Sequence, residues 1–266
     1  MNKKIITLGP EFSYSYNVAH KYYTKKINIQ LIDTIDAVFE NINKNTNGII
    51  PIENMLNGSV RETFFKLQEG GIYIVRAFDY SVDHVLASQH NKFNIIMSHV
   101  QALVQCSKYL DKFRSKGVEI IETTSTSQAM SVAASNANIA AIGSLEATKF
   151  YNLNIIKNKI SNKQNNITRF IEVSKNKKQI NGKKTSIIIK PQFDRSGLLF
   201  EILSIFKIKN INLTKIESIP TGFKMNDYIF YLDLDGCGKD KNMVEAFDFL
   251  NTFVDVIILG SYNIDK

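Results

Sequence analysis

The sequence predicts an α/β protein followed by a second, smaller unit, and two observations carry this prediction. From Lys4 to about Met97 short apolar runs alternate with patterns of helical period, and the alternation resumes up to Phe150. Strands and helices in turn indicate a parallel sheet covered by helices. After residue 184 the order changes to strand, helix, two strands, helix and strand, which is the ferredoxin-like arrangement.

The elements of the first part are short and follow one another closely. Each expected strand is an apolar run of strand length, and each expected helix has its apolar residues on one face. Strands are expected at 5–8, 27–32, 49–52, 118–122 and 139–142, and helices at 13–23, 34–42, 60–67, 101–113, 125–134 and 145–150.

Two capping boxes support two of these helix starts. Ser59 is followed by Glu62, and Ser125 by Gln128, at the spacing that lets the two side chains cap one helix. The free N–H groups at such a helix start can also face an anion. For each box the alternative is a plain cap with no ligand.

The second part follows a polar linker. Residues 174–184 are nearly devoid of apolar side chains, as linkers are. Beyond them we expect strands at 185–190, 211–219, 227–234 and 256–262, and helices at 197–207 and 243–253.

The formal net charge of +8 does not by itself indicate a nucleic-acid partner. The basic residues are dispersed in short pairs, such as Lys25 and Lys26, and form no stripe that could follow phosphates. Only five of the 33 basic residues are arginines, while Asn, Ile and Lys abound, which is typical of a compositional bias of the genome. A modest positive field also favours an acidic substrate.

Features that are missing from the sequence indicate where the protein is located and whether it binds a metal. No apolar stretch is long enough to span a membrane and no signal-peptide core follows Met1, so we expect a cytoplasmic protein without a membrane partner. Cys106 and Cys237 lie in different parts, with no Cys-x-x-Cys and no clustered histidines. We therefore expect reduced structural thiols and no metal site.

Four segments carry polar groups that suit a small anionic ligand. They lie where strands give way to loops or helices, at 8–11, 50–60, 98–106 and 166–170. The most informative is Thr168-Arg169-Phe170, which places a hydroxyl, a fixed cation and an aromatic ring in a row, although it also fits an ordinary strand. Because ligands of open α/β sheets bind beyond the carboxyl ends of strands, we expect these segments to meet in one cleft.

With these segments in place, the chain resembles the prephenate dehydratase family over essentially its whole length. The resemblance rests on residues 50–60, 98–106, 123–127 with Ala129, 140–144 and 168–170, in the order of the family. The second part resembles an ACT regulatory domain, with Ile211 to Ser218 matching the effector motif.

The resemblance implies a specific domain organisation. A catalytic domain, 1–174, would consist of two lobes with a cleft between them, like type II periplasmic binding proteins. Lobe one would span about 1–76 and 160–174, and lobe two about 77–159. A linker at 175–184 and an ACT domain at 185–266 would follow.

The resemblance also implies the reaction and its regulation. Prephenate would lose water and carbon dioxide to give phenylpyruvate, without a cofactor, because aromatisation of the ring drives the reaction. L-phenylalanine would act as a feedback effector bound between ACT domains of a homodimer or homotetramer. Two alternatives remain: an arogenate dehydratase, and a non-catalytic amino-acid sensor on the same scaffold.

Four residues take catalytic roles on this resemblance. Thr168 would hydrogen-bond the departing hydroxyl, and as a weak acid it is expected to relay or stabilise. Glu53 would be a protonated donor if burial raises its pKa, beside Asn54. Gln105 would reach the substrate from the other lobe. The alternatives are a strand residue at Thr168, a solvated Glu53, a turn-forming Asn54 and an exposed Gln105.

Further residues are expected to bind the substrate. Arg169 suits a bidentate carboxylate contact, with a structural ion pair as the alternative. The capped helix start at Ser125 would hold a carboxylate through hydroxyls and N–H groups, Ser98 would cap its own helix, and His99 is expected to be structural. The expected substrate-binding residues are Arg169, Phe170, Ser13, Ser98, Ser125, Thr126 and Ser127.

The resemblance also implies an effector site in the second part of the chain. The expected effector-binding residues are Gly197, Leu198, Asn212, Leu213, Glu217 and Ser218.

The chain departs from the family pattern at four positions. Phe12 stands where the family has glycine, Met55 where it has serine, Val100 where it has proline and Ile219 where it has arginine. A phenylalanine adopts positive φ with difficulty, so we expect either a different turn or a glycine that the family did not need for its dihedral.

Overall fold

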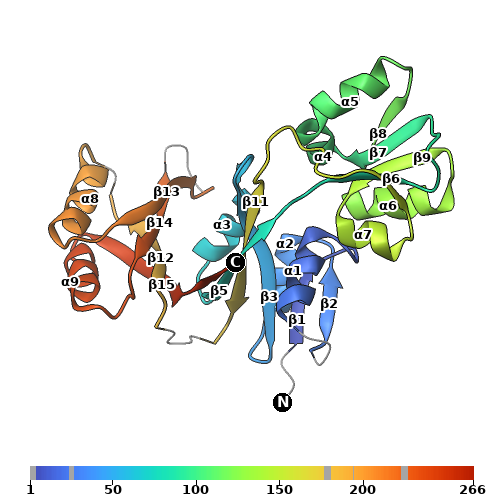
Figure 1. Ribbon diagram of the computed structural model, residues 1–266. Coiled ribbons are helices and arrows are strands. Elements are labelled where there is room, and N and C mark those ends of the chain that lie inside the picture. The colour runs from blue at the N-terminus through green and yellow to red at the C-terminus, as the bar shows by residue number, and fades with distance from the viewer. Residues whose placement is uncertain (1–3, 24–26, 177–180, 194, 223–226) are drawn as a thin grey trace.

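The computed structural model describes residues 4–23, 27–176, 181–193, 195–222 and 227–266. Its elements form three units around three sheets, as Figure 1 shows. Two of them, lobe one and lobe two, belong to the first part of the chain, and the third is the C-terminal unit. None of the helices in these residues is long and apolar enough to cross a membrane.

Lobe one is built on a mixed sheet. Within the described residues its strand order is β16-β5-β11-β3-β1-β2, with β4 paired to β3. β1 runs parallel to β2 and β3, whereas β11 is antiparallel to β3 and β5, so the expected parallel sheet holds only for its N-terminal half. The strands are β1 (Lys4–Leu8), β2 (Ile29–Ile32), β3 (Thr46–Asn54), β4 (Gly58–Ser59), β5 (Tyr73–Ser81), β11 (Ile167–Ser174) and β16 (Ile264–Asp265), and the helices are α1 (Tyr14–Tyr22), α2 (Ile35–Asn41) and α3 (Arg61–Gln68).

Lobe two is a smaller α/β unit. Its sheet has the order β10-β6-β9-β7-β8 in the described part of the chain. The strands are β6 (Val85–Ser88), β7 (Ile95–His99), β8 (Glu119–Thr123), β9 (Ile139–Gly143) and β10 (Asn154–Lys157), and the helices are α4 (Val100–Gln105), α5 (Ser107–Arg114), α6 (Thr126–Ser135) and α7 (Leu145–Phe150). Met130 of α6 and Ala141 of β9 belong to one of its two buried clusters.

The chain passes between the lobes twice, and the two crossings lie side by side. The Val82 N–H donates to the Asn166 carbonyl at 2.8 Å. β5 keeps the chain in the lobe-one sheet until Ser81 rather than to about residue 76, and the Ile160 side chain packs in lobe two. Both crossings therefore lie later in the sequence than expected.

The C-terminal unit has the expected β-α-β-β-α-β order. Its sheet has the order β13-β14-β12-β15 within the described residues, and all three pairings are antiparallel. The elements are β12 (Lys184–Pro191), α8 (Leu198–Ile208), β13 (Leu213–Pro220), β14 (Tyr228–Asp235), α9 (Lys241–Leu250) and β15 (Val254–Tyr262). Helices α8 and α9 cover one face of this sheet. The expected linker lies between Ser174 and Lys184, and residues 177–180 within it are outside the described residues.

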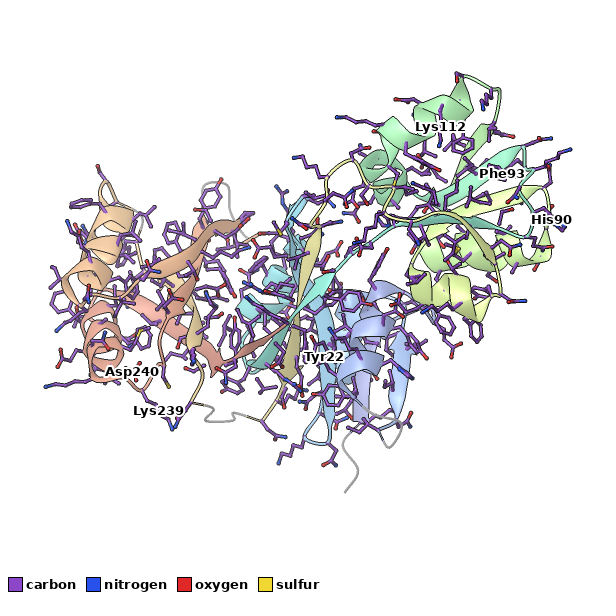
Figure 2. All side chains as sticks on the ribbon, viewed as in Figure 1. Tyr22, His90, Phe93, Lys112, Lys239 and Asp240 are labelled. Atoms are coloured by element: carbon purple, nitrogen blue, oxygen red, sulfur yellow. The ribbon has the colours of Figure 1, made fainter. Side chains whose placement is uncertain are left out.

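The other face of the C-terminal sheet packs on lobe one. Phe64 of α3 and Tyr231 of β14 meet edge to face, with ring centroids 4.7 Å apart, and side chains of both units fill the space between the sheets (Figure 2). Ile219 is buried in this shared core, where an arginine would lie among apolar side chains. After β15 the chain returns to lobe one, where β16 pairs with β5. The C-terminal unit is thus held at two places.

Two of the expected helices differ in the structure, and the expected cap of a third is confirmed. The helix expected at 101–113 is divided at Cys106, whose ψ of 10° departs from the helical range. Burial raises the pKa of the Cys106 thiol to about 12. The Ser59 side chain does not cap α3: Val60 stands at the N-cap position, and the Ser59 hydroxyl accepts from Lys215 and donates to Glu217, both of the C-terminal unit. The Ser125 side chain does cap α6, accepting from the Gln128 N–H at 3.0 Å.

Candidate active site

A cavity of about 330 Å³ lies between the two lobes. Lobe one contributes the end of β3, the start of α1 and one face of β11, and lobe two contributes α4 and the start of α6. The described residues that line it include no Lys, Arg, Asp or Glu. A bound anion would therefore be held here by hydroxyl, amide and backbone N–H groups.

Thr168 and Asn54 occupy one wall of this cavity and face each other across two strands. They are register partners on β11 and β3, and the Asn54 Nδ2 donates to the Thr168 Oγ1 at 2.9 Å. The Asn54 Oδ1 accepts from the N–H groups of Leu56 and Asn57, each at 3.0 Å, which fixes the orientation of the amide. Because Thr168 accepts from Asn54, its hydroxyl hydrogen is left to point at a ligand.

A chain of side-chain hydrogen bonds leads from Asn54 to the opposite lobe. Its second Nδ2 hydrogen goes to the Asn166 Oδ1 at 2.7 Å, and the Asn166 Nδ2 donates to the Gln105 Oε1 at 3.1 Å. The Gln105 Oε1 also lies 2.8 Å from the His84 Nε2, and the His84 Nδ1 lies 2.9 Å from the Tyr14 hydroxyl. Gln105 is thus a junction between the lobes.

Sequence reasoning missed two members of this chain, Tyr14 and His84, and included Asn166 only as the first residue of the segment 166–170. His84 and Asn166 lie on the two crossings, and no motif marks His84. Burial lowers the pKa of His84, so its imidazole is neutral at neutral pH. Since the Gln105 Oε1 can only accept, the His84 Nε2 carries the hydrogen, and Nδ1 accepts from Tyr14.

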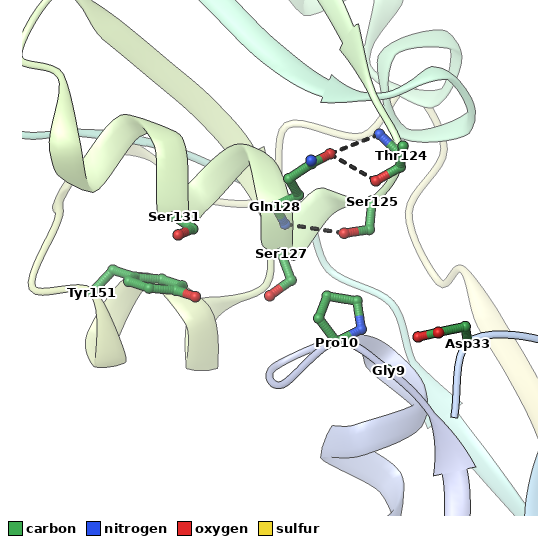
Figure 3. A pocket seen from close by; sticks show the side chains of 9 residues that line it. All are labelled: Gly9, Pro10, Asp33, Thr124, Ser125, Ser127, Gln128, Ser131 and Tyr151. Carbon is green, nitrogen blue, oxygen red and sulfur yellow. Dashed lines mark hydrogen bonds between the residues drawn. The ribbon is translucent and has the colours of Figure 1, made fainter. Parts of the chain in front are cut away.

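The start of α6 forms the lobe-two wall. Ser125 and Thr126 line the main cavity, and Ser125 also lines an adjoining hollow of about 560 Å³ (Figure 3). Ser127 lines only this second hollow, and its hydroxyl donates to the Glu11 carbonyl of lobe one. The N-terminus of a helix attracts anions, so this wall suits a carboxylate.

The other expected binding residues divide between the cavity and the core. Phe170 and Ser13 line the cavity, and Ser13 also caps α1 by accepting from the Tyr16 N–H at 3.2 Å. Ser98 is instead buried in β7, where its hydroxyl donates to the Ile142 carbonyl at 2.7 Å. The expected cap is therefore wrong: His99 caps α4, with its Nδ1 accepting from the Gln101 N–H.

The two charged residues of these motifs, Glu53 and Arg169, do not line the cavity. Successive residues of a strand point to opposite faces, so Glu53 and Arg169, themselves register partners, lie behind Asn54 and Thr168. The Arg169 guanidinium makes two hydrogen bonds to the Asp79 carboxylate, at 2.7 and 2.9 Å. Burial opposes the charge of Arg169, yet its hydrogen bonds to Asp79 and the nearby charges of Asp79, Tyr262 and Asp233 raise its pKa overall. The structural ion pair considered as the alternative is present.

The Phe12 backbone adopts a positive φ of 63°, which neither expectation for this turn foresaw. The Phe12 ring stacks on Phe150 of lobe two at a centroid distance of 4.0 Å and meets the Tyr16 ring edge to face. The ring therefore offsets the backbone strain with a contact that joins the lobes. Met55 is exposed and lies outside the cavity.

Within the described part of the chain, the expected effector residues do not all line one shared cavity. Ser218 lines a hollow of about 230 Å³ with Phe193 and Tyr228, whereas Glu217 points at lobe one. The Asn212 Nδ2 donates to Asp235 at 2.6 Å, and the Gly197 backbone has a φ of 82° immediately before α8, whose first residue is Leu198. Leu213 packs on the core beneath the helices.

The fold and the interlobe cavity define a two-lobed α/β protein with an appended β-α-β-β-α-β unit. The prephenate dehydratase family model matches residues 5–178, and the chain belongs to this family. It is 34% identical over 274 residues to prephenate dehydratase of Methanocaldococcus jannaschii, covering 98% of each chain. It is 32% identical to arogenate dehydratase/prephenate dehydratase 2 of Arabidopsis thaliana, covering 97% of this chain and 72% of the relative.

A solved structure is similar over the same length. Prephenate dehydratase of Arthrobacter aurescens in complex with L-Phe superimposes with a TM-score of 0.85 at 25% identity. The match covers 98% of this chain and 89% of that one, so it includes the C-terminal unit as well as both lobes.

Proposed function

We propose that the chain converts prephenate to phenylpyruvate in the interlobe cavity. The observation that carries this proposal is the Thr168 hydroxyl, fixed by Asn54 at 2.9 Å and left with its hydrogen for a ligand. In the reaction the bond between the ring and its carboxylate breaks, and the electron pair moves through the ring and expels the hydroxyl group. One proton is taken up, and carbon dioxide and water leave.

Thr168 hydrogen-bonds the departing oxygen, where negative charge develops as the carbon–oxygen bond lengthens. A donor held in advance at such a position stabilises the transition state more than the ground state. The polar chain through Asn54, Asn166 and Gln105 fixes this donor relative to lobe two. Proton delivery by water through the cavity completes the loss of the hydroxyl group.

The substrate carboxylates bind at the start of α6, through the hydroxyls and N–H groups at Ser125 and Thr126. The described residues that line the cavity include no acidic side chain, and His84 is neutral. The two substrate carboxylates therefore meet no negatively charged side chain of this lining. Phe170 gives the ring an apolar wall. The protein thus contributes the orientation of the substrate and hydrogen bonds to it, and the reaction needs no cofactor.

The test is phenylpyruvate formation by the purified protein from prephenate, with arogenate assayed in parallel. We expect turnover of prephenate, and loss of turnover in Thr168→Val. Consumption of arogenate alone would assign the chain as an arogenate dehydratase. No turnover of either substrate, together with binding of L-phenylalanine, would identify an amino-acid sensor.

We further propose that the C-terminal unit is an ACT domain through which L-phenylalanine regulates a homo-oligomer. The L-Phe complex of the Arthrobacter relative supports this proposal. The expected effector residues are spread over the unit, and we propose that they act between two copies. Calorimetry with L-phenylalanine, with D-phenylalanine as control, and light scattering test this: no heat, or a monomer at all concentrations, would contradict it.

A further inference from the structure

The C-terminal unit reaches lobe one directly behind the Thr168 and Asn54 pair. Lys215 of β13 extends its ammonium group to the Glu53 Oε1 at 3.0 Å and to the Ser59 Oγ at 2.9 Å. The Lys215 side chain is largely buried, with 12% of it exposed, and its Nζ lies 5.4 Å from the centroid of the Phe64 ring. A lysine so placed is fixed in geometry, unlike a surface lysine.

Glu53 and Ser59 are the two ends of one small hairpin. They are register partners across β3 and β4, and Asn54 pairs with Gly58 immediately inside them. Within this hairpin the N–H groups of Leu56 and Asn57 hold the Asn54 Oδ1. Lys215 therefore bridges both arms of the hairpin that orients Asn54.

Glu217, also on β13, completes the contact. Its Oε2 accepts from the Ser59 hydroxyl at 2.8 Å and lies 3.9 Å from the Lys215 Nζ. Ser59 thus donates to one residue of β13 and accepts from another. The hairpin is held by the C-terminal unit at both of its arms.

We propose that Lys215 is a positioning residue for the reaction in the interlobe cavity: by clamping the Glu53 and Ser59 arms, it holds Asn54 in the orientation that presents the Thr168 hydroxyl. This inference rests on the proposed dehydratase activity. It makes β13 part of the scaffold of the active site, so that a movement of this strand changes the hydrogen bond to Thr168. Glu53 acts from behind the sheet and not as an acid in the cavity.

A matched pair of lysine variants tests the proposal. Lys190 of β12 also reaches lobe one, donating to the Gln68 carbonyl at 2.9 Å, but it contacts the far end of α3 and not the hairpin. We expect Lys215→Met to lower kcat at least about tenfold while KM changes less than about threefold, because the carboxylate site lies elsewhere. Lys190→Met should retain the wild-type kcat. Lys215→Arg keeps the positive charge, so its kcat should be much closer to the wild-type value than that of Lys215→Met.

Hydrogen exchange gives a readout that does not depend on turnover. The amides of Leu56 and Asn57 should exchange faster in Lys215→Met than in the wild type, and at the wild-type rate in Lys190→Met. Equal exchange in all three proteins, or a loss confined to KM, would overturn the positioning role. If the wild type makes no phenylpyruvate but the exchange difference is found, the proposed function fails and the clamp stands.

A second variant serves if Lys215→Met does not fold. Glu53→Gln keeps the shape and accepts a weaker hydrogen bond from Lys215, so it should lower kcat in the same direction but less. When both substitutions are combined, the loss in kcat should be no larger than that of Lys215→Met alone. Additive losses would show that the two residues act separately and would contradict the clamp.

Discussion

The Asn54 side-chain amide donates to the Thr168 hydroxyl oxygen at 2.9 Å, across two neighbouring strands in register. The direction of this bond is set by two backbone N–H groups that occupy the other end of the Asn54 amide. The threonine is thereby an acceptor from the protein and a donor toward the cavity.

Removing the Thr168 hydroxyl should abolish most of the activity without disturbing the fold. Thr168→Val keeps the shape, and we expect kcat to fall about 10²- to 10³-fold, the usual cost of losing one donor to developing charge. Thr168→Ser is the control, because it retains the hydroxyl. Steady-state kinetics with prephenate measures both, and a Val variant within about threefold of the wild type would remove Thr168 from the chemistry.

Changing the direction of the Asn54 bond should be nearly as damaging. Asn54→Asp can still accept from Leu56 and Asn57 but cannot donate, so Thr168 would turn its hydrogen toward the new carboxylate. We expect a fall in kcat of about 10²-fold. Asn43→Asp is a matched control, since the Asn43 Oδ1 likewise accepts from a backbone N–H, that of Asn45, in an exposed turn. Equal activities for the two variants would contradict the assignment.

Stability should fall in acid because of His84. Burial lowers the pKa of His84 in the folded protein, so below about pH 6.5 the unfolded chain binds more protons than the folded one. Stability is therefore complete above this range and decreases as the pH falls through it. His84→Gln should reduce the drop in thermal midpoint between about pH 7.5 and pH 5.5.

The control for this measurement is His90→Gln. His90 is an exposed residue at the edge of lobe two (Figure 2), and its replacement should leave the pH dependence as in the wild type. A parallel loss of midpoint in the wild type and His84→Gln would exclude His84 as the titrating group.

Two substitutions at Phe12 should separate backbone strain from ring stacking. Both Phe12→Ala and Phe12→Gly lose the contact with Phe150, but only alanine keeps the penalty of a left-handed backbone. We expect the alanine variant to be less stable than the glycine variant by about 1 kcal/mol. Equal thermal midpoints, or the reverse order, would mean that the turn relaxes when the ring is lost.

Local patterns predicted much of the chain. Strand and helix periodicity located the parallel part of lobe one and the order of the C-terminal unit, and the box at Ser125 does cap its helix. The prediction that Ser59 caps α3 was wrong because Val60, not Ser59, stands at the N-cap position, and the Ser59 hydroxyl oxygen accepts from the distant Lys215. The prediction of one continuous helix at 101–113 was wrong, because the spacing of apolar residues gives no sign of the local break at Cys106.

What the sequence by itself determined are properties that depend on neighbours along the chain: the elements, the family motifs and the polar character of Thr168, Asn54 and Gln105. Only the tertiary structure decided which face of each strand meets the cavity. The strand pairing turns Asn54 and Thr168 inward and sends Glu53 and Arg169 to the back of the sheet, toward Lys215 and Asp79. Alternation along a strand is visible in a sequence, but which side is covered by another unit depends on packing between distant segments.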